Sequence, residues 1–284
     1  MERLTVHVTD ANNMKIRDYL TRRLGFSASL IGKVKYDNVI LNGRPVHMRA
    51  SINTGDVIEV IFPEENTECV EPMDIPIDVL FEDEAVLVVS KPKDMPIHPS
   101  RGNSLPTLAN AVRSYLGKPF VFRAITRLDR DTSGLVLIAK DHLSAALLSR
   151  DMAAGRIKKQ YVALVEGVPS PLCGRIEAPI EREAPDSIKR IVRDDGKNAI
   201  TEYEVIKTCE NGNSLVKVNL ITGRTHQIRV HMAHIGHPLV NDFLYGTEKE
   251  GETYYLHCFL ITFTHPITRE TITINTSQSS EDTI

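Results

Sequence analysis

The sequence predicts an α+β protein whose main sheet is mixed and largely antiparallel. Strand-like segments follow one another in groups with few helical segments between them, which is typical of this class. Two of these segments, 201–206 and 271–274, alternate with the period of two that marks a half-buried strand. The length of 284 residues and the apolar content of 42% fit one large and one small globular domain.

The large domain is expected to be rich in strands. Its strands are predicted near 85–90, 135–139, 159–166, 200–208, 214–221, 255–263 and 270–275, and its helices near 107–116, 142–154 and 225–235. In the last helix, Thr225 is the expected N-cap, and Gly236 with Pro238 ends it. Helical spacing gives this helix an apolar stripe of Ile228, Met232 and Ile235 and a polar face of Gln227, His231 and His234.

The first sixty residues are expected to form a separate unit. A basic amphipathic helix is predicted over Met14–Leu24, and Ser27 is the expected N-cap of a second helix that ends near Lys35. A hairpin with strand 39–41 follows, because Asn42-Gly43 is a strong turn pair. Another turn and strand are expected over 54–60.

The charge distribution supports this division. The net charge of the chain is −3, but residues 1–63 carry +3, residues 64–84 carry −9, residues 85–240 carry +8 and residues 241–284 carry −5. The basic segments are the ones that bear the motifs described below, so the average conceals a surface suited to phosphates. The predicted organisation is a small domain over 1–63, an acidic linker over 64–76, a large domain over 77–277 and a polar tail over 278–284.

A lone carboxylate between two arginines stands out in the segment 127–134, Arg-Leu-Asp-Arg-Asp-Thr-Ser-Gly. It lies between an apolar pair and a β-favouring run, so Asp129 is expected on a loop between two strands. Arg127 and Arg130 would keep such a carboxylate ionised, and an ionised carboxylate can act as a nucleophile or a general base. From these eight residues alone, a surface ion-pair network on a loop is an equal alternative.

A second polar cluster spans residues 221–246 and contains arginines, a glutamine and several histidines. The spacing of His231 and His234 is compatible with a metal site on a helix. Arg224 and Arg229 would repel a cation there, and Asp242 is the nearest carboxylate. We therefore expect no metal, and we expect the histidines to serve helix packing and phosphate contacts.

Four segments together resemble RNA pseudouridine synthases of the RluA type, in the order of that family. Residues 91–99 resemble its Lys-Pro…His-Pro element, 127–134 its catalytic loop, 158–167 its tyrosine strand, and 223–245 its Gly-Arg-x-His-Gln-x-Arg segment. The matched region runs from about residue 78 to residue 265. The resemblance implies an α+β fold with an active-site cleft across the sheet, and an isomerase that converts uridine in structured RNA to pseudouridine without a cofactor.

Residue by residue, the resemblance implies that Asp129 is the essential aspartate and that Tyr161 packs on the target base. It implies that Arg229 pairs with Asp129 and that Arg127 fills the space left by the flipped uridine. The other residues expected to contact substrate or RNA are Arg130, Arg224, His226, Gln227, Lys91, His98, Lys15, Arg22, Arg23 and Lys33. Two positions depart from the family pattern, since Thr126 stands where His is usual and Asp94 where Gly is usual. Taken alone, Tyr161 is more often a packed strand tyrosine, and His98 a turn residue.

The small unit resembles an S4-type RNA-binding domain, on the pattern of Ser27, Lys33, the segment 39–44 and Gly55-Asp56. This resemblance implies RNA as the partner of residues 1–63. The basic helix favours that role over a packing or oligomerisation domain. Ribosomal RNA is the expected substrate, because such a domain suits a large folded RNA, and transfer RNA is the alternative.

Other classes of protein remain in view. A non-catalytic RNA-binding or ribosome-assembly factor is a second class. Such a protein would have no physical reason to keep Asp129, Tyr161 and Arg229 together, because this set is costly to maintain. A hydrolase acting on a nucleoside or glycoside bond usually needs two carboxylates about 5–10 Å apart, and only Asp131 lies near Asp129. No apolar run approaches a membrane span, the N-terminus lacks a signal-peptide core, and Cys69, Cys173, Cys209 and Cys258 show no paired spacing. We therefore expect a cytoplasmic protein; the oligomeric state stays open.

Overall fold

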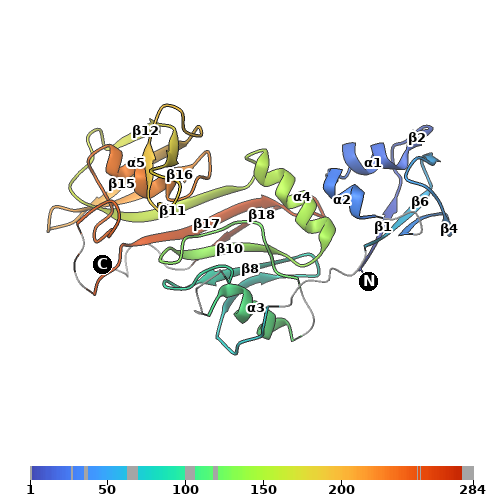
Figure 1. Ribbon diagram of the computed structural model, residues 1–284, viewed down its shortest axis with the longest axis horizontal. Coiled ribbons are helices and arrows are strands. Elements are labelled where there is room, and N and C mark those ends of the chain that lie inside the picture. Colours follow the sequence, from blue (N-terminus) through green and yellow to red (C-terminus); the bar gives the residue numbers. More distant parts are fainter. Residues whose placement is uncertain are drawn as a thin grey trace.

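The fold comprises a small unit and a large sheet-based unit (Figure 1). Helix α4 of the large unit packs against the small unit. The computed structural model describes residues 2–26, 28–34, 38–62, 70–99, 106–117, 121–247, 249 and 251–276. The expected N-cap Ser27, the helix end at Lys35, part of the acidic linker and the polar tail lie outside these residues, as does the side chain of Lys33.

The small unit is a four-stranded sheet with two short helices against it. Its sheet has the order β1(Glu2–His7), β6(Val57–Phe62), β3(Val39–Leu41), β4(Arg44–Pro45), and β2(Met14–Lys15) pairs with β5(Ser51–Ile52). The helices are α1(Ile16–Arg22) and α2(Ala28–Lys33). The predicted hairpin is confirmed: Asn42 and Gly43 have φ of 47° and 79°, the pair of positive values that a type I′ turn requires.

The large sheet is mixed and largely antiparallel, as predicted. Its path is β12(Cys173–Glu177), β15(Ile200–Thr208), β16(Ser214–Leu220), β11(Lys158–Val165), β17(Leu256–Thr264), β10(Ser133–Ala139), β8(Val86–Lys91), β7(Asp78–Glu82). In addition, β18(Thr271–Asn275) pairs with β17, and β9(Arg123–Ala124) pairs with β10. The short strands β13(Ile180–Arg182) and β14(Arg190–Val192) form a separate antiparallel pair.

The centre of this sheet aligns two of the predicted segments. Strand β17 lies between β10, which runs parallel to it, and β11, which runs antiparallel. Gly134 pairs with Cys258 from one side and Tyr161 pairs with Cys258 from the other. Neighbouring strands lie about 4.8 Å apart, so the end of the 127–134 loop and the Tyr161 backbone are separated by roughly 10 Å.

Gly134 is required by this arrangement. Its φ is +110°, and a Cβ atom on it would lie 2.2 Å from the carbonyl oxygen of Cys258. Only glycine combines this backbone conformation with so close an approach of two strands. The glycine therefore allows β10 to meet β17 directly after the loop that carries Asp129.

The helices of the large unit begin as the sequence predicts in two of three cases. Helix α3(Leu108–Leu116) starts with a capping box between Thr107 and Asn110, and helix α4(His142–Ala153) is capped by the Asp141 side chain. Helix α5(Gln227–His234) begins differently from the prediction, as described below. No helix among the described residues is long and apolar enough to cross a membrane.

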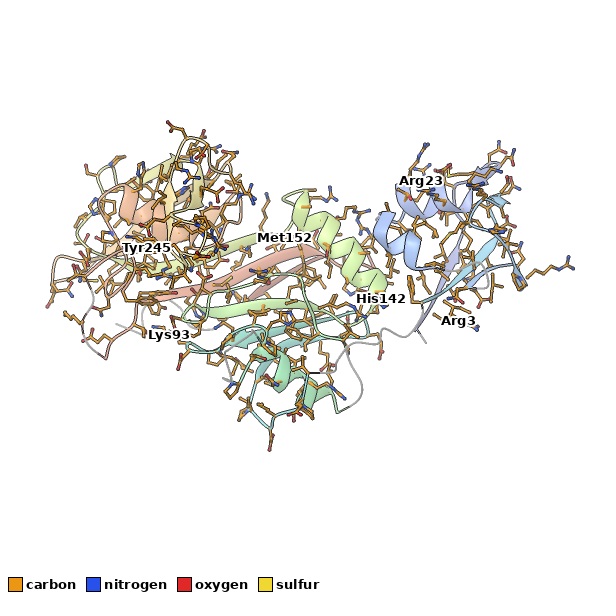
Figure 2. The ribbon with its side chains drawn as sticks, viewed as in Figure 1. Arg3, Arg23, Lys93, His142, Met152 and Tyr245 are labelled. Atoms are coloured by element: carbon orange, nitrogen blue, oxygen red, sulfur yellow. The ribbon has the colours of Figure 1, made fainter. Side chains whose placement is uncertain are left out.

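Helix α4 packs against both units through different sides. Leu143 and Leu147 belong to the buried cluster of the small unit, whereas Leu148 belongs to the core under the large sheet. The ring of His142, at the start of α4, stacks on Phe62 with 5.2 Å between centroids (Figure 2). The small unit is therefore packed against the large one through α4.

Candidate active site

A cavity of about 350 Å³ lies where the 127–132 loop, strand β11 and the start of α5 meet. Its walls bring together two segments that are nearly 100 residues apart in the chain. The lining residues are Ile125, Arg127, Leu128, Asp129, Thr132, Met152, Lys159, Tyr161, Leu220, Gly223, Arg224, Thr225, His226, Gln227, Ile228, Arg229 and Leu256. The predicted Asp129, Tyr161, Arg229 and Arg127 therefore line one cavity.

Lys91 stabilises the loop that carries Asp129 through hydrogen bonds to backbone carbonyl groups. This lysine is fully buried, and its Nζ donates to the carbonyl oxygens of Pro92 (2.7 Å) and Arg130 (2.9 Å). Burial lowers the pKa of Lys91 to about 8, although Asp131 and Asp129 act in the opposite direction. The expected RNA contact of Lys91 is wrong, because the amine is buried and engaged in holding the loop.

The two departures from the family pattern have structural explanations. Thr126 is fully buried, and its Oγ1 accepts a hydrogen bond from the Leu137 amide (2.9 Å), so it joins the loop to β10. Asp94 has φ of +56°, a conformation in which Gly is usual and Asp is tolerated. Neither residue lines the cavity.

Arg130 does not pair with Asp129, contrary to the prediction that both flanking arginines would hold this carboxylate. Its guanidinium donates to both oxygens of Asp131 (2.8 and 3.2 Å) and lies 3.4 Å from Asp94. Asp131 is buried, so the arginine neutralises a carboxylate beneath the loop. Asp131 is correspondingly bound to Arg130 and does not line the cavity as a second carboxylate.

Tyr161 lines the cavity with a buried ring, and its hydroxyl keeps its proton. It is 3% exposed, and burial raises the pKa of its hydroxyl well above 10, an effect that Cys258 and Asp129 reinforce. A neutral phenol at physiological pH offers a ring face for stacking on a base. The same placement on β11 points its hydroxyl toward the Cys258 thiol on β17.

Lys159 is a cavity residue that the sequence reasoning did not assign to the site. It precedes Tyr161 by two positions on β11, is 8% exposed, and lies with its Nζ 5.8 Å from the centroid of the Tyr161 ring. Burial lowers the pKa of Lys159, while Cys258 and Asp129 act to raise it. Its shared strand face with Tyr161 was the available signal.

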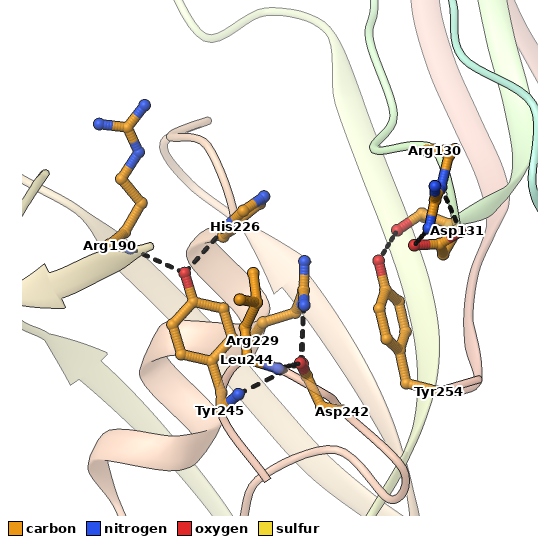
Figure 3. A network of polar contacts seen from close by, with 10 residues as sticks. Arg130, Asp131, Arg190, His226, Arg229, Asp242, Leu244, Tyr245 and Tyr254 are labelled. Atoms are coloured by element: carbon orange, nitrogen blue, oxygen red, sulfur yellow. Dashed lines mark hydrogen bonds and ion pairs between the residues drawn. The ribbon is translucent and has the colours of Figure 1, made fainter. Parts of the chain in front are cut away.

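Arg229 forms its ion pair with Asp242, which corrects the expected pair with Asp129. The two side chains are almost completely buried, and Arg229 donates from Nε and Nη2 to the two carboxylate oxygens at 2.7 and 2.6 Å (Figure 3). Asp242 also accepts from the backbone amides of Leu244 and Tyr245. Asp129 acts on Arg229 only through its charge.

Aromatic rings enclose the Arg229 guanidinium on its other sides. Its Cζ lies 4.5 Å from the centroid of the Tyr254 ring, 5.0 Å from that of Tyr245 and 5.3 Å from that of Phe243. Cation–π contacts in a desolvated setting contribute about 2 kcal/mol. The guanidinium is thus fixed in one orientation at the cavity wall before any ligand arrives.

The N-cap of helix α5 is His226, one residue after the predicted N-cap Thr225. His226 has φ of +58°, and its Nδ1 lies 2.8 Å from the Tyr245 hydroxyl. That hydroxyl also accepts from the Arg190 amide (2.8 Å), so its own proton points to Nδ1 (Figure 3). Burial lowers the pKa of His226, and the neutral ring then carries its proton on Nε2.

Gln227 holds the start of α5 through hydrogen bonds within the protein. It is 2% exposed; its Oε1 accepts from the Arg224 amide and the Thr222 hydroxyl, and its Nε2 donates to Ile200 and Thr201. These bonds, rather than a Thr225 cap, tie the start of α5 to strand β15. Gln227 also lines the cavity, so its predicted contact with substrate RNA stays a prediction.

Two further histidines of this region make hydrogen bonds within the protein. His231 bonds to Thr201 and to the carbonyl oxygen of Ala178, and His237 bonds to the carbonyl oxygen of Glu166. His231 is fully buried. Within the described part of the chain, no group of His, Cys, Asp or Glu is arranged to hold a metal ion.

The remaining predicted contacts divide between the rim of the cavity and the small unit. Arg127 is exposed at the rim, and Arg224 lies in the wall. His98 is exposed and stands edge-on to Phe122. The small unit carries Lys15, Arg22 and Arg23, and Figure 2 shows Arg23 on that unit, away from Met152 of the cavity wall.

Comparisons with known proteins agree on one kind of enzyme. A family model described as RNA pseudouridylate synthase matches residues 85–234. The protein named uncharacterized RNA pseudouridine synthase YjbO of Bacillus subtilis (strain 168) is 38% identical over 267 residues, which cover 90% of this chain and 93% of that protein. Ribosomal large subunit pseudouridine synthase D of Xanthomonas campestris pv. campestris is 34% identical, covering 87% of this chain and 80% of that protein.

Solved structures give the same result for the fold. Human RNA Pseudouridylate Synthase Domain Containing 1 superposes with a TM-score of 0.62 and 26% identity, covering 73% of this chain and 86% of that one. Human RNA Pseudouridylate Synthase Domain Containing 4 has a TM-score of 0.58 at 20% identity, with 72% and 89% covered. The second similarity concerns the fold alone.

Proposed function

The chain belongs to the RNA pseudouridylate synthase family, and from this premise we propose that it modifies large-subunit ribosomal RNA with Asp129 as its essential carboxylate. The isomerase activity on RNA follows from the family. The substrate is inferred from relatives named ribosomal large subunit pseudouridine synthase D. Transfer RNA is the alternative substrate, and an RNA-binding factor without activity is the alternative class.

The observation that carries the proposal is the joint placement of Asp129, Tyr161 and Arg229 on one cavity of about 350 Å³. In the reaction the bond between C1′ and N1 of uridine breaks, the uracil turns, and C1′ bonds to C5; N1 gains a proton and C5 loses one. No electron is exchanged with another molecule. An ionised carboxylate suffices to attack the sugar, attack C6 of the base or remove a sugar proton.

Base flipping explains why the cavity is built around a tyrosine and an exposed arginine. A uridine inside folded RNA must leave its stack, at a cost of a few kcal/mol. Stacking of the base on Tyr161 contributes about 1–3 kcal/mol in return. Arg127 is exposed at the rim, where its guanidinium is suited to occupy the gap in the RNA. The basic small unit, as an S4-type domain, adds phosphate contacts through Lys15, Arg22 and Arg23.

The test maps pseudouridines in ribosomal and transfer RNA from cells that lack the gene, and then restores the wild-type protein or Asp129→Asn. We expect a site in large-subunit RNA to disappear and only the wild type to restore it. Asp94→Asn is the matched control, because Asn also tolerates positive φ and Asp94 does not line the cavity. Full activity of Asp129→Asn would refute the catalytic assignment, and loss of a transfer RNA site instead would refute the choice of substrate.

A further inference from the structure

A second depression of about 220 Å³ adjoins the cavity that holds Asp129. It is lined by Ile180, Glu181, Arg190, Lys197, Gly223, Arg224 and Thr225. The segment 223–225 lines both hollows, so they meet along one stretch of backbone. We call this second depression the side groove.

Arg190 enters the side groove with part of its guanidinium unused. Its backbone amide donates to the Tyr245 hydroxyl, but its buried Nε atom has no hydrogen-bond partner among the described residues. Figure 3 shows the side chain extending away from Tyr245 and His226. A buried donor without an acceptor costs about 1–3 kcal/mol. Arg190 also lines the groove, where an anion can accept from the rest of its guanidinium.

Two further cations face the same groove. Arg224 is held by a hydrogen bond from its Nε to the carbonyl oxygen of Asn198 (3.0 Å), which fixes the direction of its guanidinium. Lys197 is fixed through its backbone, which exchanges hydrogen bonds with Ile180 in both directions (2.9 and 3.0 Å). The groove is thus lined by Arg224, whose guanidinium is held in place, together with Arg190 and Lys197.

One carboxylate also lines the groove. Glu181 accepts from the Arg182 backbone amide (2.8 Å), and this bond, together with Lys197, Arg193 and Arg190, lowers its pKa. Because Glu181 is ionised, the lining carries three positive charges and one negative charge. The remaining excess of positive charge favours an anion.

We propose that the side groove binds the phosphodiester next to the flipped uridine, through Arg190, Arg224 and Lys197. Guanidinium groups match phosphate oxygens with paired hydrogen bonds, and ammonium groups add a point charge. The shared 223–225 segment favours an RNA backbone over a free anion, because the nucleotide that occupies the cavity carries its own phosphates directly past it. This inference rests on the proposed function and identifies a path for the substrate strand beside the cavity.

The salt dependence of RNA binding tests the proposal. Binding of large-subunit ribosomal RNA transcribed in vitro is measured over a range of salt concentrations for the wild type and Arg190→Ala, whose backbone still donates to Tyr245. Loss of one phosphate contact should reduce the slope of log K against log salt by about 0.7–0.9. Arg190→Lys should retain most of the slope. Arg175→Ala removes the same charge from an arginine paired with Glu177 and Glu202, and should keep the wild-type slope.

A second variant of the same binding experiment removes a negative charge instead of a positive one. Glu181→Gln removes the negative charge from the side groove, so we expect tighter binding and no decrease in the slope. Equal slopes for the wild type, Arg190→Ala and Arg175→Ala would overturn the proposal, and so would weaker binding by Glu181→Gln. Pseudouridine formed in the same RNA is measured in parallel: its absence with the wild-type protein counts against the proposed function, while the slopes judge the side groove independently.

Discussion

Arg229 is oriented at the cavity by a carboxylate thirteen residues further along the chain. Asp242 holds it through two buried hydrogen bonds, and the carboxylate is itself held by backbone amides of the following turn. A buried ion pair of this kind is costly to break, because the remaining partner keeps its charge without compensation. Asp242 therefore acts through Arg229 as a positioning residue, although it does not line the cavity.

Asp242→Asn should lower the rate of pseudouridine formation at saturating RNA and leave the apparent RNA affinity nearly unchanged. It also removes the counter-charge of a buried guanidinium, which costs about 3–5 kcal/mol when a partner is lost completely. The measurement compares kcat and KM below the melting temperature of the variant. If Asp242 acts through Arg229, adding Asp242→Asn to Arg229→Gln lowers kcat no further. Glu204→Gln, in the exposed pair with Lys217, is the control and should leave kcat and KM unchanged.

Sequence reasoning identified the residues that meet at the cavity but misassigned several of their partners. The motifs located Asp129, Tyr161 and Arg229, since each lies in a matched segment. The pairing of Arg229 depends on how the turn after α5 folds back, and local spacing does not report that. Burial separates Lys91 from RNA, and burial of a polar side chain depends on tertiary packing rather than on sequence period.

At the level of secondary structure, the strands with a long alternating or apolar run were predicted within two residues, as for β15 and β18. Strands β13 and β14 were missed because three residues carry too little periodicity to recognise. Strand β7 was missed because its run of three apolar residues between Asp78 and Glu82 is too short to recognise. The start of α5 was misplaced because its N-cap, His226, has a left-handed backbone conformation and is held by Tyr245, which is distant in the sequence.

Gly134→Ala should destabilise the meeting of β10 and β17 by more than about 2 kcal/mol, because the new methyl group would overlap the Cys258 backbone at a positive φ. Thermal and urea unfolding measure the loss. Gly155→Ala is the matched control, since Gly155 also has positive φ (+67°) but has open space where a Cβ would lie. Equal losses in the two variants would show that backbone conformation, and not the close strand approach, determines the cost.

Across the whole molecule, the two units share helix α4 as a common wall. Adjacent leucines of this helix serve different cores: Leu147 faces the small unit and Leu148 faces the large sheet. The amphipathic pattern of a single helix does not reveal that its two apolar sides belong to separate domains. For this reason the sequence left the contact between the domains open, and the structure supplies it.

Replacing Leu143 and Leu147 together by Ala should release the small unit from the large one. Each buried leucine contributes about 2–5 kcal/mol when truncated in a packed core, so the docked arrangement loses most of its apolar support. Small-angle X-ray scattering should show a larger radius of gyration. Leu148→Ala should instead lower the melting temperature of the large unit without changing the scattering. Unchanged scattering of the double variant would indicate that other contacts hold the units together.

Helix α4 also works as a spacer of fixed length. His142, at one end, touches the small unit, and Met152, near the other end, lines the cavity (Figure 2). Its 12 residues span about 18 Å at the helical rise. For an RNA bound by both units, as proposed, this length sets the distance between the contacts on the small unit and the uridine in the cavity.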